Sequence, residues 1–251
     1  MQPNFKLRER IYTNNDRSIA IFKTRKRQTI LFIAVKVYSK KRQPLYNKEY
    51  SILKNLSSKS IIKVYNYYED EKNFYMEMEY CASSDLSQYL WSNKHCNYFE
   101  KVIKVVSTQI LLGLKNLHSN GIIHCNLKPS NIVLDEFGNV KICDLKKALN
   151  INEMSNEDIK INKSAMTPCY TAPELFTENG VFSFKSDFWA LGCIMYEMAV
   201  GQVPYYDHNM NKLIMKILNE PVDFSMKNFQ EYSDDFIEVL KRLLDKDYNN
   251  R

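Results

Sequence analysis

Short runs of β-branched and aromatic residues, separated by polar turns, dominate the first third of the chain. Such runs predict strands, and they fall at residues 18–22, 29–37, 61–68 and 73–80. Between the second and third runs, Pro44 precedes apolar positions that recur at helical spacing, which predicts a helix over 45–56. The first third is therefore predicted to form a sheet with one helix.

Further along the chain, the apolar positions step by three and four, as on one buried face of a helix. The longest such pattern predicts a helix around 103–117 that ends at Gly121. Further helices are predicted at 187–200, 210–218 and 234–244. Two short strands, 132–134 and 140–142, flank a turn that contains Gly138. Strands followed by helices predict an α+β fold with a ligand cleft at the junction of the two parts.

The composition fits one soluble domain or two packed lobes, with 251 residues of which 45% are apolar and 25% charged. The net charge of +6 comes partly from short basic clusters at 23–27 and 40–42, which we interpret as solvated faces, so no nucleic-acid partner is expected. None of the six cysteines shows CxxC spacing, which argues against a zinc site and favours free thiols in the cytoplasm. No apolar run approaches the ~18 residues of a membrane span, so no membrane partner is expected.

Seven motifs occur in the order and at the intervals typical of one protein family. They lie at residues 33–36 (IAVK), 49 (E), 78–81 (MEYC), 124–131 (HCNLKPSN), 144–146 (DLK), 167–174 (TPCYTAPE) and 187–192 (DFWALG). Through them the sequence resembles the protein kinase family, serine/threonine type. The resemblance implies a bilobal kinase fold, in which a small β-rich N-lobe with one C-helix spans 1–79 and a hinge spans 80–85. A larger, mainly helical C-lobe spans 86–251, without the last helix of the family.

Within that family the sequence is most similar to the branch of Fused, the fourth Unc-51-like kinase and Runkel. The segments that carry this similarity are 79–86, 125–131 and 186–193. The resemblance implies a protein that associates with microtubule-based structures.

The same resemblance assigns nucleotide-binding roles to residues that are present here. Lys36, paired with Glu49, would reach the α- and β-phosphates of ATP, while Asn131 and Asp144 would hold Mg²⁺. The positions for the adenine ring, the hinge contacts and the ribose are Ile21, Ala34, Val133, Glu79, Cys81 and Asp85.

The glycine-rich loop that cradles phosphates in this family is missing, because no glycine precedes Gly113. Asn14, Asp16 and Ile19 stand where its three glycines would be. A β-branched residue does not readily adopt the backbone angles that glycine allows, and the Asp16 carboxylate would repel phosphate. A plain β-hairpin with a polar turn is therefore predicted for this segment.

The catalytic loop carries an amide where the family has its base, because Asn126 replaces the aspartate. An amide has no comparable basicity, and general-base catalysis contributes roughly 10² to 10⁴ in rate. Asn126 could still orient a hydroxyl, or cap the loop through side-chain hydrogen bonds. Lys128 is retained and, with Thr167, matches the serine/threonine class. Glu174 and Arg251 match an ion pair that ties residues 167–174 to the C-lobe.

Two more substitutions change the charge around these positions. Lys146 replaces a glycine, and its cation would compete with Mg²⁺ for Asp144 or for phosphate oxygens. Cys125 replaces the arginine that receives the activation-loop phosphate in many relatives, so loop phosphorylation is not expected to activate the chain.

Three hypotheses follow from these residues. The first is a pseudokinase that binds ATP weakly or without Mg²⁺ and serves as a conformational scaffold for protein partners. The second is a serine/threonine kinase of low activity, because Lys36 and Asp144 are retained. The third is a scaffold that binds no nucleotide.

Overall fold

The computed structural model describes residues 6–26, 29–82, 84–92, 98–152, 167–178 and 180–251. The chain forms two compact units, each built from two segments. Unit 1 comprises residues 1–84 and 133–147, and unit 2 comprises residues 85–132 and 148–251. An antiparallel sheet together with separate helices confirms the predicted α+β class.

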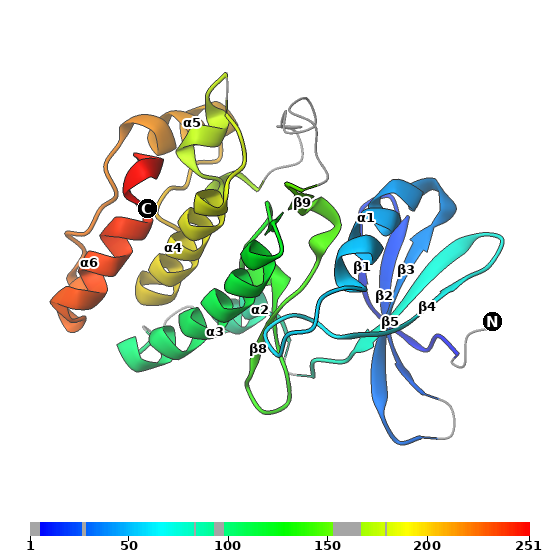
Figure 1. Ribbon diagram of the computed structural model, residues 1–251. Coiled ribbons are helices and arrows are strands. Elements are labelled where there is room, and N and C mark those ends of the chain that lie inside the picture. The colour runs from blue at the N-terminus through cyan, green and yellow to red at the C-terminus, as the bar shows by residue number, and fades with distance from the viewer. Residues whose placement is uncertain (1–5, 27–28, 83, 93–97, 153–166, 179) are drawn as a thin grey trace. The chain divides into compact units, whose positions relative to one another are not determined.

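Unit 1 is built on a five-stranded antiparallel sheet with the strand order β1-β2-β3-β5-β4 (Figure 1). Its strands are β1 (Glu9–Thr13), β2 (Ile19–Arg25), β3 (Phe32–Ser39), β4 (Val64–Glu69) and β5 (Asn73–Glu79). The central strand β3 is buried on both faces. Ile33 and Val35 belong to a cluster with Tyr75 on one face, whereas Lys36 and Tyr38 contact the following helix from the other.

That helix, α1 (Gln43–Leu53), lies against the sheet of unit 1 (Figure 1). Tyr46 stacks on Phe74 of β5 with ring centroids 4.3 Å apart, and Tyr50 meets Tyr67 of β4 edge-on at 4.3 Å. Two short strands, β7 (Ile132–Leu134) and β8 (Val140–Ile142), form the predicted hairpin.

The bounds of several elements of unit 1 differ from the sequence prediction: β4 begins at Val64 instead of residue 61, and α1 ends at Leu53 instead of residue 56. The strand predicted over 29–37 begins only at Phe32, because Thr29 turns back to bond the carbonyl of Lys26 through its amide at 3.2 Å and its hydroxyl at 3.1 Å. Strand β1 is the first arm of the predicted hairpin, but the sequence gives no bounds for it, since all five of its residues are exposed and no apolar alternation occurs there.

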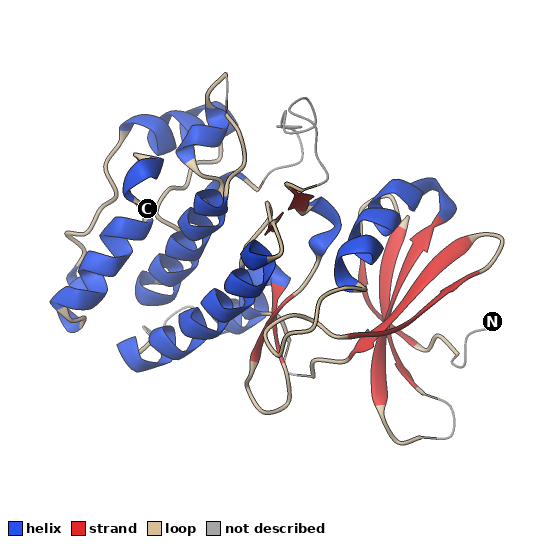
Figure 2. Ribbon diagram, viewed as in Figure 1, coloured by secondary structure: helices blue, strands red, loops and turns tan. Residues whose placement is uncertain are grey.

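Helices dominate unit 2, as Figure 2 shows. They are α2 (Leu86–Ser92), α3 (Glu100–Ser119), α4 (Phe184–Val200), α5 (Met210–Asn219) and α6 (Asp234–Leu243). A two-residue pairing joins β6 (Ile122–Ile123) to β9 (Leu149–Asn150). The long helices α3 and α4 match the predicted ones, and α4 ends at Gly201, whose φ of 77° is left-handed. None of the helices in the described ranges is long and apolar enough to cross a membrane.

Candidate functional site

Unit 1 contains a network of four charged side chains. Nζ of Lys36 on β3 lies 2.8 Å from Oε2 and 3.0 Å from Oε1 of Glu49 on α1, and 2.7 Å from Oδ1 of Asp144, which follows β8. The Lys36 and Glu49 side chains are only 4% and 1% exposed. Burial opposes the ammonium charge, but Asp144 and Glu49 outweigh it and raise the pKa of Lys36 well above its ordinary value. The structure therefore contains the predicted Lys36–Glu49 pair, with Lys36 as a charged ammonium group.

The fourth member of the network, Lys146, binds the other oxygen of Asp144. It lies in the 3₁₀ turn Leu145–Lys147, and its Nζ is hydrogen-bonded to Oδ2 of Asp144. Burial favours the protonated acid, but the ammonium groups of Lys36 and Lys146 outweigh it and hold the pKa of Asp144 well below its usual range. Asp144 is thus an ionised carboxylate with one ammonium group on each oxygen.

This arrangement does not fit a magnesium ligand at Asp144. Mg²⁺ requires oxygen ligands at about 2.0–2.1 Å in near-octahedral geometry, and an ammonium group on Oδ2 repels a divalent cation at the same oxygen. Within the described ranges, no group of three or more His, Cys, Asp and Glu side chains could hold a metal ion. Asn131, the other predicted ligand, lies in unit 2, where its Nδ2 donates to the backbone oxygen of Asn126 at 2.8 Å.

The β1–β2 turn uses its own side chains to bond the backbone amides that a phosphate cradle would offer. Oδ1 of Asp16 accepts from the amide of Ser18 at 3.0 Å, and Oδ1 of Asn14 accepts from the amide of Ile19 at 2.8 Å. The guanidinium of Arg42 is bonded to Oδ2 of Asp16. Hydrogen bonds from Ser18 and then from Arg42 hold the pKa of Asp16 well below its usual value. The predicted polar hairpin is confirmed, and a phosphate there would meet an ionised carboxylate instead of free amides.

The predicted adenine and hinge positions all lie in unit 1: Ile21, Ala34, Glu79, Cys81 and Val133. Glu79 is paired with Lys141, whose Nζ is 3.2 Å from Oε2. Burial raises the pKa of the Cys81 thiol to about 12, so this cysteine is a neutral, unreactive group at ordinary pH. Asp85, the predicted ribose contact, lies in unit 2 and accepts from the amide of Gln88 at 2.9 Å in the first turn of α2.

The catalytic-loop residues lie in unit 2. Asn126 is 8% exposed, and its backbone amide donates to Nδ1 of His124 at 3.2 Å. Its side-chain amide makes no hydrogen bond to any residue in the described part of the chain. The prediction that the Asn126 side chain caps the loop is therefore wrong as far as bonds to the described residues are concerned. Lys128 donates from Nζ to Oγ1 of Thr167 at 3.2 Å, which brings the two predicted serine/threonine markers together.

Asp187 on α4 fixes the start of the same loop. Its Oδ2 accepts from the amide of His124 at 2.9 Å and its Oδ1 from the amide of Cys125 at 3.1 Å. These bonds hold Cys125 at a φ of 61°, a left-handed angle that is uncommon outside glycine.

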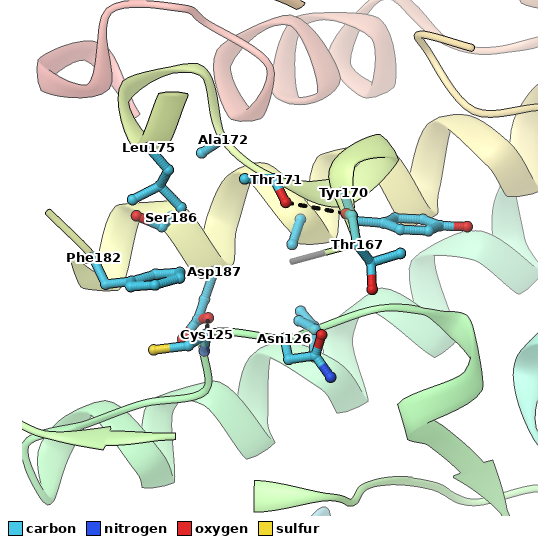
Figure 3. Close-up of a pocket in the computed structure, with 12 residues that line it drawn as sticks. Cys125, Asn126, Thr167, Tyr170, Thr171, Ala172, Leu175, Phe182, Ser186 and Asp187 are labelled. Atoms are coloured by element: carbon cyan, nitrogen blue, oxygen red, sulfur yellow. Dashed lines mark hydrogen bonds between the residues drawn. The ribbon is translucent and has the colours of Figure 1, made fainter. Parts of the chain in front are cut away.

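A small cavity lies beside these residues (Figure 3). Its volume is about 20 Å³, enough for about one water molecule. The lining residues are Cys125, Asn126, Leu127, Thr167, Tyr170, Thr171, Ala172, Leu175, Phe182, Ser186, Asp187 and Ala190. None of these lining residues is a lysine or arginine, so the cavity holds no cation that could receive a phosphate.

The segment that follows Thr167 is tied to the rest of unit 2 by the predicted ion pair. The guanidinium of Arg251 bonds to Oε2 of Glu174 and donates to the carbonyl of Lys185 at 3.2 Å. Its side chain is fully buried and lies over the ring of Trp189 at 5.4 Å.

Two residues of unit 1 were not identified from the sequence. Tyr38 is bonded through its hydroxyl to Glu49, and the only sequence signal for it is an aromatic residue two positions after Lys36 on the same strand face. Arg42 belongs to a basic cluster that we interpreted as a solvated face, whereas its guanidinium anchors the β1–β2 turn.

Similarity to known proteins identifies the family to which the chain belongs. The family model of the protein kinase domain matches residues 18–251, so the chain belongs to the protein kinase family. This confirms both the predicted family and the kinase fold that the resemblance implied.

Serine/threonine kinases are among its relatives. RUNKEL of Arabidopsis thaliana is 35% identical over 227 residues, which are 90% of this chain and 16% of that protein. TIO, also of Arabidopsis thaliana, is 31% identical over 92% of this chain and 17% of its own length. ULK4 of Mus musculus is 28% identical over 92% of this chain and 19% of its own length. The chain thus spans less than a fifth of these relatives.

Proposed function

We propose that this kinase domain is a pseudokinase that binds ATP without magnesium and acts as a conformational scaffold for protein partners. The observation that carries the proposal is the bond from Lys146 to Asp144, which puts a lysine ammonium on the carboxylate where the family binds its metal. The Lys146 ammonium group supplies part of the positive charge that Mg²⁺ would otherwise supply.

Nucleotide binding is supported by the retained ion pair of unit 1. Lys36 is charged, buried and held in one place, as a lysine that contacts phosphates must be. Its charge and that of Lys146 are balanced by Glu49 and Asp144, so the four groups sum to zero. A triphosphate is therefore attracted weakly unless Lys146 turns towards it, which the flexible lysine stem and its three donor hydrogens allow. This charge balance favours weak binding.

Loss of phosphotransfer is supported by two independent features. Asn126 has an amide in place of the base, and the amides of Ser18 and Ile19 are already bonded to side chains of their own turn. Phosphoryl transfer depends on positioning and electrostatic stabilisation, and both features remove part of that.

Two alternatives have support of their own. A serine/threonine kinase of low activity is favoured by the similarity to RUNKEL and TIO, which are named serine/threonine-protein kinases, and by the Lys128–Thr167 contact. A scaffold that binds no nucleotide is favoured by the network around Lys36, which is complete without a ligand. Protein partners, a cytoplasmic location and association with microtubule-based structures stay predictions from the sequence.

A phosphotransfer assay with labelled ATP and Mg²⁺ tests the proposal. The chain is compared with its Lys36→Ala variant, in which the phosphate-contacting lysine is absent. Label is measured on the chain itself and on a generic basic protein substrate. If wild type and Lys36→Ala incorporate equal amounts, the result supports a pseudokinase. Incorporation that disappears in Lys36→Ala would instead establish the low-activity kinase.

A further inference from the structure

Tyr38 lies beside the charged network of unit 1, on the same face of β3 as Lys36. Residues two apart on a strand point to the same side, and Nζ of Lys36 is 5.3 Å from the Tyr38 ring centroid. The Tyr38 side chain is fully buried. Its hydroxyl is hydrogen-bonded to Oε2 of Glu49.

This bond completes the coordination of the Glu49 carboxylate. Oε1 receives Nζ of Lys36 at 3.0 Å and the amide of Leu145 at 3.1 Å. Oε2 receives Nζ of Lys36 at 2.8 Å and the hydroxyl of Tyr38. Each oxygen thus accepts two bonds, and every donor belongs to unit 1. A buried carboxylate is stable only when it is paired and hydrogen-bonded in this way.

The direction of the bond is fixed by chemistry. An ionised carboxylate can only accept, so the Tyr38 hydroxyl donates. Burial, followed by the charge of Glu49, raises the pKa of Tyr38 far above its ordinary value, so the donor hydrogen stays in place at physiological pH.

Tyr46 provides an internal comparison on the helix itself. Its ring packs edge-on against Tyr38 at 5.9 Å and stacks on Phe74 at 4.3 Å, and it is 8% exposed. No hydrogen bond joins its hydroxyl to a residue in the described ranges. Two buried tyrosines therefore link α1 to the sheet, and only one of them does so through its hydroxyl.

We propose that Tyr38 is a positioning residue, whose hydroxyl holds Glu49 and α1 against the sheet so that the Lys36–Glu49 pair stays closed without any ligand. A partner that recognises the closed position of α1 would then bind the free protein as well as the loaded one. The position of α1 does not depend on the proposed ATP binding. Only the effect of Tyr38 on nucleotide affinity rests on the proposed function. If the Lys36–Glu49 pair is already closed, no binding free energy is used to shift α1 from an open to a closed position.

Hydrogen exchange measured by mass spectrometry on the nucleotide-free chain tests this role. In Tyr38→Phe, which keeps the ring and removes the hydroxyl, peptides from α1 are expected to exchange about tenfold or more faster than in the wild type. Peptides from α4 report global stability and are expected to be unchanged. The matched variant Tyr46→Phe, which removes a hydroxyl without a bond, is expected to behave as wild type.

Unchanged exchange of α1 in Tyr38→Phe, or an equal increase in Tyr46→Phe, would overturn the proposal. A second experiment distinguishes the hydrogen bond from a packing role of Tyr38. In a Glu49→Ala background the acceptor is absent, so Tyr38→Phe should cause no further increase in the exchange of α1. If Glu49→Ala does not fold, the comparison of Tyr38→Phe with Tyr46→Phe still shows whether the Tyr38 hydroxyl holds α1. Since no nucleotide is present, failure of ATP binding would leave the result of this experiment unaffected.

Discussion

Nζ of Lys146 is hydrogen-bonded to Oδ2 of Asp144, while Oδ1 of the same carboxylate lies 2.7 Å from Nζ of Lys36. The two lysines come from different elements of unit 1, β3 and the turn after β8. Together they neutralise the carboxylate at the position where the resemblance places a metal ligand.

Removing the Lys146 ammonium should make nucleotide binding depend on magnesium. In Lys146→Met the stem is retained, and Oδ2 of Asp144 is freed for a divalent cation. We expect the affinity for ATP to rise on addition of Mg²⁺ in this variant and to be indifferent to Mg²⁺ in the wild type, as measured by titration calorimetry. Lys146→Arg keeps the charge and should behave as wild type. A magnesium response of equal size in all three proteins would show that Lys146 does not control the metal.

Restoring the base alone should not restore transfer. Asn126→Asp supplies a carboxylate worth roughly 10² to 10⁴ in rate in an intact active site, but the Lys146–Asp144 bond and the closed β1–β2 turn remain. Incorporation of labelled phosphate should therefore stay at the level of Lys36→Ala in the single variant, and should rise above it only when Asn126→Asp is combined with Lys146→Gly. Robust transfer by Asn126→Asp alone would mean that the rest of the site is competent.

Most of this network can be predicted from the sequence, because the resemblance to the protein kinase family assigns Lys36, Glu49 and Asp144 to one nucleotide site. Whether Lys146 would bond to Asp144 or remain free for phosphate could not be decided from the sequence. A four-carbon stem reaches both, and a residue type alone does not say which partner the stem turns towards.

Other features depend on tertiary contacts that leave no periodic signal. The bond from Tyr38 to Glu49 joins residues eleven positions apart on a strand and a helix. The bond from Arg42 to Asp16 spans twenty-six positions. Strand β1 is an exposed edge without apolar alternation, and its run of β-branched and aromatic residues, 11–13, is shorter than a typical strand.

The Asp144 contribution to stability should be lost in acid. Its pKa is depressed in the folded state relative to the ordinary value of 3.8, so the folded state binds fewer protons than the unfolded state below that value. The stabilisation is fully present above that value and declines as the pH falls towards the folded pKa. Urea unfolding should show wild type more stable than Asp144→Asn by about 1–3 kcal/mol near neutral pH.

That difference should shrink at about pH 3 and below. Asp235→Asn, at an exposed position of α6, supplies the control, because it leaves the charged network intact. A gap between wild type and Asp144→Asn that stayed constant across the acid range would mean that the carboxylate is not selectively stabilised in its ionised form.

The buried pair between Glu174 and Arg251 should be a main determinant of the stability of unit 2. Removing one partner of a buried pair strands the other charge and costs about 3–5 kcal/mol. Arg251→Met should therefore lower the thermal midpoint by roughly 6–20 °C, at about 2–4 °C per kcal/mol for a chain of this size. Lys212→Met, at an exposed position of α5, is the matched control and should change the midpoint little. Equal effects of the two variants would exclude a special role for the pair.

Thermal unfolding shows most directly whether the chain binds nucleotide without metal. The midpoint is measured with ATP alone, with ATP and EDTA, and with ATP and Mg²⁺. At a ligand concentration of 100 times Kd, binding adds about 2.7 kcal/mol, which corresponds to roughly 5–11 °C for a chain of this size. We expect an upward shift of the same size in all three conditions. A shift that appears only with Mg²⁺, or no shift in any condition, would contradict it.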